Sequence, residues 1–172
     1  MNLKFTAVTP DDLDIVTEYE TASYHPEEAA SREQLARRIH YAAESGPELF
    51  TVARDMDQNG KVVGFLCTTL TTADLVTDES MSRHEPNGRT VCLHSVCVSP
   101  DYRNQGIATK LLENWIEQLK QANQQAKKYD RVVLMSRPNL LGLYGGVGFK
   151  EVGVSKVVHG PEPWHDCVLE LQ

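Results

Sequence analysis

The chain has 172 residues, of which 41% are hydrophobic and 24% are charged. These values are typical of a soluble globular protein, and the length predicts one domain over residues 1–172 without a second full domain. This length can support a core without disulfides or metal ions. With 17 Lys and Arg residues against 24 Asp and Glu, the formal charge of −7 disfavours nucleic acid and anionic membranes as partners and favours a cationic one.

The N-terminal segment and the cysteines indicate the cellular compartment. The opening segment Met1–Thr6 has no basic region followed by an apolar one, and no later stretch approaches about 18 consecutive apolar residues. We therefore expect a cytoplasmic protein that neither enters the secretory pathway nor spans a membrane. The cysteines are scattered over apolar segments without a C-x-x-C pair, which predicts reduced, mostly buried thiols. They are Cys67, Cys92, Cys97 and Cys167.

Capping signals place two helices early in the chain. Thr9 as N-cap before Pro10 predicts a helix over residues 10–21. Ser31 and Gln34 form a capping-box pattern, which predicts a second helix that ends near residue 44. Alternating apolar residues predict three strands, the last two as a hairpin: 4–8, 50–54 and 62–70.

The second half alternates strands and helices. Residues 73–90 are polar and predict a long loop with a short helical stretch around 77–81. Thr90–Val98 is rich in β-formers, typical of a central strand buried on both faces. A 3.6-residue apolar spacing predicts a helix from Gly106 that fades over 121–125. The other expected elements are strands 131–135, 149–154 and 166–171 and a helix 140–144 closed by Gly145 and Gly146. This order predicts an α/β fold with a mixed sheet.

The junction after the strand at 90–98 offers an anion-binding turn. Unpaired amides at a helix N-terminus can hold a phosphate or pyrophosphate, small residues at Gly106 and Ala108 permit close approach, and Arg103 can add a charge. An ordinary strand-to-helix turn explains the glycine as well. The residues match neither the dinucleotide nor the nucleoside-triphosphate fingerprint.

Two motifs resemble those of one enzyme superfamily. Arg103-x-x-Gly106-x-Ala108 resembles the Q/R-x-x-G-x-G/A signature of the GNAT acetyltransferases, and Tyr144 to Phe149 looks like their Y-x-x-x-G-F. More narrowly, residues 75–80, 84–86 and 93–98 resemble the arylalkylamine (serotonin) N-acetyltransferases. The similarity runs from Phe5 to Leu171.

The resemblance implies a fold and a co-substrate. The GNAT fold has a mixed, mostly antiparallel sheet of about seven strands flanked by helices. Acetyl-CoA is the implied co-substrate, without a metal ion. The residues that the resemblance assigns to acetyl-CoA binding are Val96, Cys97, Val98, Arg103, Asn104, Gln105, Gly106, Ile107, Ala108, Thr109 and Asn139.

Direct acetyl transfer needs a base for the ammonium and a proton for the departing thiolate. His94, inside an apolar strand, is the candidate base, and the resemblance places Tyr144 beside the CoA sulfur as the candidate acid. The alternatives are that His94 is a buried histidine whose polar atoms are hydrogen-bonded in the core, and that Tyr144 only packs against the helix. The arylalkylamine enzymes carry H-x-H on this strand, whereas this chain has Cys92 at the first position. The proton relay is therefore altered, with His94 alone or with help from His84. Cys92 as a nucleophile or metal ligand is a weaker alternative.

The acceptor is expected to be a small amine. The resemblance places Tyr24, Pro26, Met135 and Trp164 around the ring of an arylalkylamine, although each can equally be core. Acidic residues in the 73–90 loop also suit a polyamine, or form a solvated face. The open alternatives are a protein or peptide N-acetyltransferase and a non-catalytic acyl-CoA sensor. The sequence implies no specific protein partner.

Overall fold

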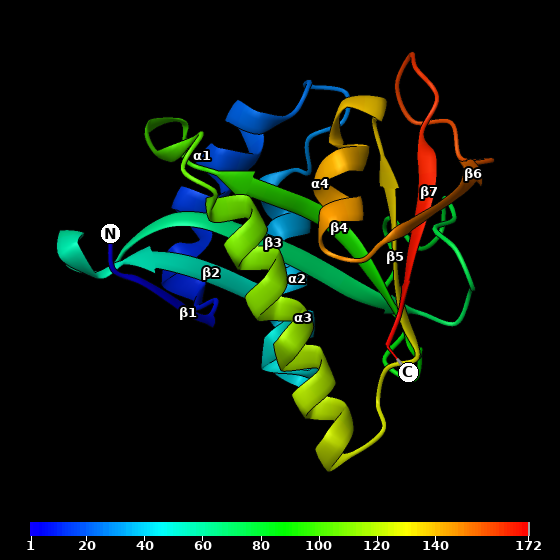
Figure 1. Cartoon of the computed structure of the whole chain (residues 1–172), viewed down its shortest axis with the longest axis horizontal. Coiled ribbons are helices and arrows are strands. Elements are labelled where there is room, and N and C mark those ends of the chain that lie inside the picture. Colours follow the sequence, from blue (N-terminus) through cyan, green and yellow to red (C-terminus); the bar gives the residue numbers. More distant parts are fainter. Residues whose placement is uncertain (172) are drawn as a thin grey trace. The chain divides into compact units, whose positions relative to one another are not determined.

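Seven strands and four α-helices form in the part of the chain that the computed structural model describes, residues 1–171 (Figure 1). The strands are β1 (Leu3–Ala7), β2 (Phe50–Asp55), β3 (Lys61–Thr71), β4 (Thr90–Val98), β5 (Arg131–Ser136), β6 (Lys150–Val154) and β7 (His165–Glu170). The helices are α1 (Leu13–Ser23), α2 (Arg32–Ser45), α3 (Ile107–Gln125) and α4 (Leu141–Gly146). None of the helices within residues 1–171 combines the length and apolarity needed to cross a bilayer.

The sheet is mixed, as predicted. Its strand order is β1-β2-β3-β4-β5-β7-β6. The pairs β1–β2, β2–β3, β5–β7 and β6–β7 are antiparallel, and β4–β5 is parallel. The α/β prediction with a mostly antiparallel sheet of seven strands is therefore confirmed.

The chain divides into two compact units. One contains Met1–Thr68 and Ser95–Trp115, and the other contains Thr69–His94 and the residues from Ile116 onward. Strands β3 and β4 and helix α3 each contribute residues to both units. The expectation of one domain over residues 1–172 stays a prediction. All four cysteines are buried and outside disulfides, as predicted.

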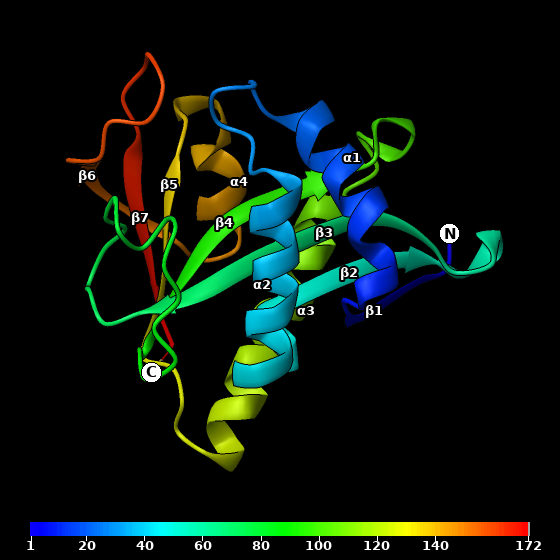
Figure 2. The ribbon, with the colours of Figure 1, turned by 180° about the vertical axis from the view of Figure 1, so that it is seen from behind.

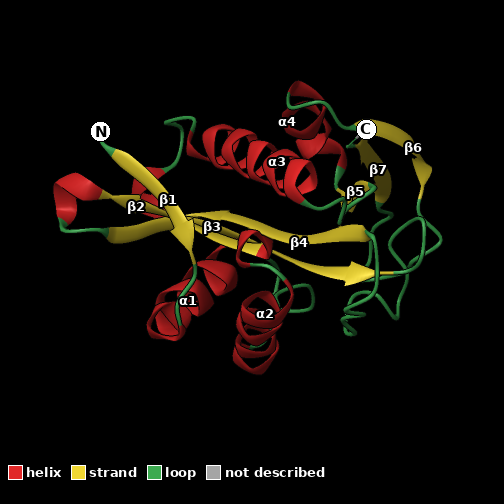
Figure 3. Ribbon diagram, turned by 90° about the horizontal axis from the view of Figure 1, so that it is seen from below, coloured by secondary structure: helices red, strands yellow, loops and turns green. Residues whose placement is uncertain are grey.

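In the first unit, α1 and α2 lie on one face of β1, β2 and β3, and the start of α3 lies on the other face (Figures 2 and 3). The predicted capping box of α2 is present. The Gln34 amide donates to Ser31 Oγ at 3.1 Å, and the Ser31 amide donates to Gln34 Oε1 at 2.9 Å. Gly64 lets the layers close, because a Cβ there would lie 3.0 Å from the Cys97 carbonyl oxygen and 3.6 Å from the Ile107 side chain.

The first predicted helix begins differently. Residues Pro10–Asp12 form a 3₁₀ turn before α1. Thr9 is the N-cap residue of this turn, as predicted, and it forms a capping box with Asp12. Its amide and hydroxyl both donate to the Asp12 carboxylate, at 2.9 and 3.2 Å, and Arg54 pairs with the same carboxylate at 2.8 Å. The Asp12 carboxylate thus closes the capping box and links the start of this segment to β2 through Arg54.

In the second unit, β5 lies between β4 and β7. Thr90–Cys92 of β4 align in parallel with Arg131–Val133, whereas β5 stays paired with β7 as far as Ser136. The prediction that Gly145 and Gly146 close α4 is wrong, since both belong to the helix. The left-handed backbone lies at Gly148, with φ of 110°, because the chain must turn back there to begin β6.

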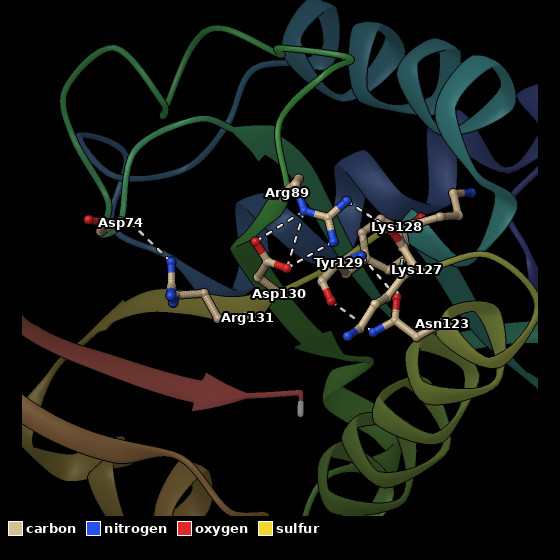
Figure 4. A network of polar contacts seen from close by, with 8 residues as sticks. All are labelled: Asp74, Arg89, Asn123, Lys127, Lys128, Tyr129, Asp130 and Arg131. Atoms are coloured by element: carbon tan, nitrogen blue, oxygen red, sulfur yellow. Dashed lines mark hydrogen bonds and ion pairs between the residues drawn. The ribbon is translucent and has the colours of Figure 1, made fainter.

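The 73–90 loop is tied down at both ends (Figure 4). The Arg89 guanidinium pairs with the Asp130 carboxylate at 2.9 Å and donates to the Lys127 carbonyl at 2.8 Å. At the other end, Asp74 pairs with Arg131 at 3.1 Å. Both ends of the loop are therefore attached to one short segment that leads into β5.

The short helix expected around residues 77–81 does not form. The Ser82 and Arg83 amides donate to the Glu79 carbonyl in a hydrogen-bonded turn. The Thr77 amide donates to Ser80 Oγ at 2.8 Å, and the Ser80 amide donates to Thr77 Oγ1 at 3.0 Å. Hydroxyl groups thus take backbone partners that a helix would use, which is why serine and threonine favour turns.

We expect Gly88→Ala to destabilise the protein, because the loop packs on β3 with no room for a side chain. A Cβ at Gly88 would lie 2.5 Å from the Thr71 carbonyl oxygen. The expected loss is about 2 kcal/mol in the free energy of unfolding, measured by urea denaturation. Gly142→Ala in α4 is the control, since a Cβ there meets nothing within 4 Å. Equal denaturation midpoints for the two variants would contradict this packing argument.

Candidate active site

The C-terminal half of β4 is open on one side. His94, Val96 and Val98 are half-exposed and alternate with the buried residues Ser95 and Cys97. The expectation that this strand is buried on both faces is therefore wrong beyond Leu93. Side chains point alternately to the two faces of a strand, so the three half-exposed residues share one face. That face can be reached by a ligand.

His94 is held by a buried hydroxyl. Its Nε2 lies 2.7 Å from Oγ1 of Thr69, whose side chain is buried at the end of β3. A threonine hydroxyl can donate or accept, so this contact can persist whether the imidazole is neutral or protonated. The arrangement fixes the ring in a half-exposed position that suits a base.

Cys92 is a packing residue. It is fully buried among apolar side chains under the 73–90 loop, and its Sγ lies 3.7 Å from Ser80 Oγ. The surrounding cluster consists of Val76, Val133, Met81, Met135 and Val168. A sealed thiol does not favour the alternative in which Cys92 attacks a substrate. Within residues 1–171, no three His, Cys, Asp or Glu side chains converge in a way that could hold a metal ion.

His84 has a structural contact of its own. Its Nδ1 accepts the Leu70 amide at 3.1 Å, and the neighbouring Glu85 amide donates to the Leu70 carbonyl at 2.9 Å. The Glu85 carboxylate also accepts the Thr72 amide, and this hydrogen bond lowers the pKa of Glu85. Residues 84 and 85 thus fasten the loop to the end of β3.

Tyr144 is fixed by the turn that follows α4. The Tyr144 carbonyl accepts the amides of Val147 and Phe149, at 3.2 and 3.0 Å. The rings of Tyr144 and Phe149 meet edge to face, with 5.8 Å between centroids. The Y-x-x-x-G-F spacing therefore has a physical basis: the turn at Gly148 brings the two aromatic rings together.

The turn before α3 has the geometry expected for anion binding. Asn104 and Gly106 have φ angles of 63° and 76°, and the segment from Arg103 to Gly106 is exposed. The Tyr102 hydroxyl donates to the Asp55 carboxylate at 3.0 Å, which raises the pKa of Tyr102 and anchors the turn on β2. The first-turn amides of α3 lack intrahelical partners and follow this exposed bend.

Tyr24 contacts the β4 backbone. Its hydroxyl accepts the Val96 amide at 3.2 Å and lies 3.3 Å from the Val96 carbonyl oxygen. The loop that carries Tyr24 is held by Glu20, whose carboxylate accepts the Ala30 amide at 2.8 Å. Glu20 is only 2% exposed, and burial raises its pKa. Tyr24 is thus positioned by its hydroxyl, and Pro26 is exposed in the same loop.

Trp164 stacks against a cation. The Arg137 guanidinium lies 3.8 Å from the centre of the indole ring, and Trp164 Nε1 donates to the His159 carbonyl at 2.6 Å. Arg137 also donates to the Glu162 carbonyl at 2.6 Å. One face of the indole is therefore covered, and Trp164 braces the connection between β6 and β7.

The other residues selected from the sequence differ in exposure. Those exposed are Pro26, Arg103, Asn104, Gln105, Gly106 and Asn139. Those half-exposed are Tyr24, His94, Val96, Val98, Ala108, Thr109 and Met135. Those buried are Cys97, Ile107, Tyr144 and Trp164. The side chains of Cys97 and Ile107 are therefore covered by the protein.

Sequence reasoning missed Thr69, Glu20 and Asp166. Glu20 follows Val16 by four residues, and that spacing placed a carboxylate on the buried face of α1. Asp166 is a charged residue within an apolar strand pattern, and this could have marked it as a candidate from the sequence. The contact between Thr69 and His94 has no sequence signal, because it depends on how β3 and β4 align.

Comparisons with known proteins agree on one family. Residues 13–149 match the model of the acetyltransferase (GNAT) family. A serotonin N-acetyltransferase from Mesocricetus auratus is 30% identical over 157 residues, which cover 91% of this chain and 72% of that protein. The solved structure of the GNAT-like decarboxylase GphF in complex with isobutyryl-CoA has a TM-score of 0.77 and 19% identity, with 100% of both chains covered. A phosphinothricin acetyltransferase from Sinorhizobium meliloti in complex with AcCoA has a TM-score of 0.72 and 17% identity, covering 99% of this chain and 89% of that one. At these identities the two structures share the fold.

Proposed function

Because the chain belongs to the GNAT acetyltransferase family, we propose that it transfers the acetyl group of acetyl-CoA directly to a small primary amine. The observation that carries this proposal is His94, a half-exposed histidine held at 2.7 Å by a buried hydroxyl on the open face of β4. A base in this position can take the proton that an ammonium must lose before it attacks a thioester.

The exposed turn before α3 fits the pyrophosphate of acetyl-CoA. Residues Arg103–Thr109 combine a left-handed Gly106, exposed amides and a guanidinium, and a phosphate is stabilised at such a helix start. The backbone of Val96–Val98 and the exposed Asn139 are proposed to contact the remainder of the molecule. Two proteins that share this fold are bound to isobutyryl-CoA and AcCoA, which supports an acyl-CoA ligand.

The proposed reaction has three steps. His94 accepts a proton from the ammonium, directly or through one water, and the neutral amine attacks the thioester carbonyl. The tetrahedral oxyanion is stabilised by backbone amides of β4, the Val96 amide exchanging its Tyr24 partner for the oxyanion. The carbon–sulfur bond then breaks, and Tyr144 donates a proton to the departing thiolate.

The acceptor is proposed to be an arylalkylamine, with polyamines as an overlapping class. The 30% identity to a serotonin N-acetyltransferase and the half-exposed Met135 support the first class. The formal charge of −7 supports the second, because it attracts polycations.

The test is release of free thiol from acetyl-CoA by the purified protein. Tryptamine, phenylethylamine, spermine and a lysine peptide serve as separate acceptors. We expect turnover with the small amines, and the ratio of kcat/KM values ranks the classes. Turnover with the peptide alone would instead indicate a protein acetyltransferase.

The burial of Cys92 favours a second candidate, a non-catalytic acyl-CoA sensor. The resemblance to the arylalkylamine enzymes implies a histidine at this position, whereas the thiol here is buried in an apolar cluster. Binding of acetyl-CoA measured by calorimetry, with no thiol release for any amine, would support the sensor and contradict the enzyme.

A further inference from the structure

A buried carboxylate that the proposed chemistry does not use lies on β7. Asp166 is only 6% exposed, and its Oδ1 has no hydrogen-bond partner among the described residues. Its side chain does have a hydrogen bond with Ser155. Buried polar atoms in proteins are nearly always paired, so an unpaired carboxylate oxygen calls for a partner from outside the chain.

Asp166 is not neutralised by a neighbouring cation. Burial raises its pKa, and the bond to Ser155 opposes this increase. Arg137 stacks on Trp164 and donates to backbone carbonyls, and the adjacent His165 pairs with Glu151. Arg137 and His165 are therefore both engaged with partners other than Asp166.

The strand registers put Asp166 on the same face as His94. Met135 of β5 is opposite Asp166 in an antiparallel pair, and Cys92 of β4 is level with Val133 in a parallel pair. Residues that are opposite each other share a face, as do residues two apart along one strand. His94, Met135 and Asp166 therefore project from one face, across three neighbouring strands.

The β6 residue opposite Asp166 leaves open space next to the strand. Gly153 is opposite Asp166 in the β6–β7 pair, and a Cβ built at Gly153 meets nothing within 4 Å. Met135, the neighbour on the other side, is half-exposed, and its Sδ lies 3.4 Å from Ser155 Oγ. A ligand lying along Met135 would thus reach the unpaired oxygen.

We propose that Asp166 binds a second ammonium group of the acceptor, so that this site selects diamines and polyamines over monoamines of equal length. His94 and Asp166 lie on β4 and β7 with β5 between them, and β4 and β5 are no longer paired beyond Cys92, so the backbones at the two residues are at least two strand spacings apart, about 10 Å. A four-carbon diamine with a hydrogen bond of about 2.8 Å at either end spans a distance of this order. The selection rests on the proposed acetyl transfer, in which one amine is acetylated near His94 and the other stays charged.

The test compares 1,4-diaminobutane with butylamine as acceptors for thiol release. We expect the wild-type kcat/KM to be about tenfold higher for the diamine, the size typical of a hydrogen bond to a charged group. Asp166→Asn should remove this preference by raising the KM for the diamine about tenfold. Its kcat for either amine and its KM for butylamine should change little.

Two controls separate this role from a structural one. Glu162→Gln removes an exposed carboxylate between β6 and β7 and should keep the diamine preference. If circular dichroism shows that Asp166→Asn does not fold, the test uses the wild type alone. Its kcat/KM ratio of diamine to butylamine should then decline as salt is added, because salt screens the pairing of the second ammonium with Asp166. Equal kcat/KM values for the two amines in the wild type, or an unchanged ratio in a folded Asp166→Asn, overturn the assignment of Asp166 while acetyl transfer stands. Absence of thiol release from every amine overturns both.

Discussion

Replacing Tyr144 with phenylalanine is expected to lower kcat about 100-fold while leaving the Kd for acetyl-CoA nearly unchanged. Loss of a positioned general acid typically costs at least this factor. Phenylalanine keeps the ring that meets Phe149 edge to face, and the carbonyl that closes the turn is untouched. The variant should therefore fold normally and lack only the proton donor.

Steady-state thiol release gives kcat, and calorimetry with acetyl-CoA gives Kd. Tyr41→Phe on α2 is the matched control, since it removes a hydroxyl outside the proposed site and should leave both values unchanged. Wild-type turnover in Tyr144→Phe would remove the tyrosine from the mechanism. Weaker acetyl-CoA binding without a change in kcat would indicate a binding role instead.

Regular elements with a clear period were predictable. The predicted strand at Thr90–Val98 has the observed bounds, and the helix predicted from Gly106 corresponds to α3. In both, local residue choice and the fold agree, so composition and spacing are sufficient. The capping box at Ser31 was equally readable, because its two partners are three residues apart.

The errors arose where a local signal competed with a tertiary one. Two glycines in a row predicted the end of α4, yet both are still helical, and the positive φ that turns the chain back lies at Gly148. Hydroxyl groups in the 73–90 loop converted an expected helix into a turn. Half of β4 is open because its pairing in register with β5 covers Thr90–Cys92, which residue types do not encode.

The candidate site was predictable in part. The resemblance pointed to His94, Tyr144 and the turn at Gly106, because each lies in a short motif. The residues that orient or extend the site come from strand alignment: Thr69 lies 25 positions before His94, and Asp166 faces Met135 across a register that no motif records. Such contacts depend on the sheet, so one sequence does not reveal them.

Replacing His94 with glutamine is expected to lower kcat/KM for the amine about 100-fold without weakening acetyl-CoA binding. Glutamine can retain a hydrogen bond to Thr69 Oγ1, but its amide accepts no proton at neutral pH. The ammonium acceptor then loses its positioned base, and general bases typically contribute at least this factor. Thiol release at saturating acetyl-CoA, with the amine varied, measures the loss.

Three further variants identify the route of the proton. Thr69→Val should lower kcat/KM about tenfold by freeing the imidazole ring, and Thr69→Ser should restore it. His84→Gln should have a small effect if His94 acts alone, because His84 Nδ1 is engaged by the Leu70 amide. A loss in His84→Gln equal to that in His94→Gln would instead require both histidines. Cys92 lies two residues before His94 on β4 and is fully buried, so its thiol cannot hold a water chain that leads to His94. This favours His94 as the only base.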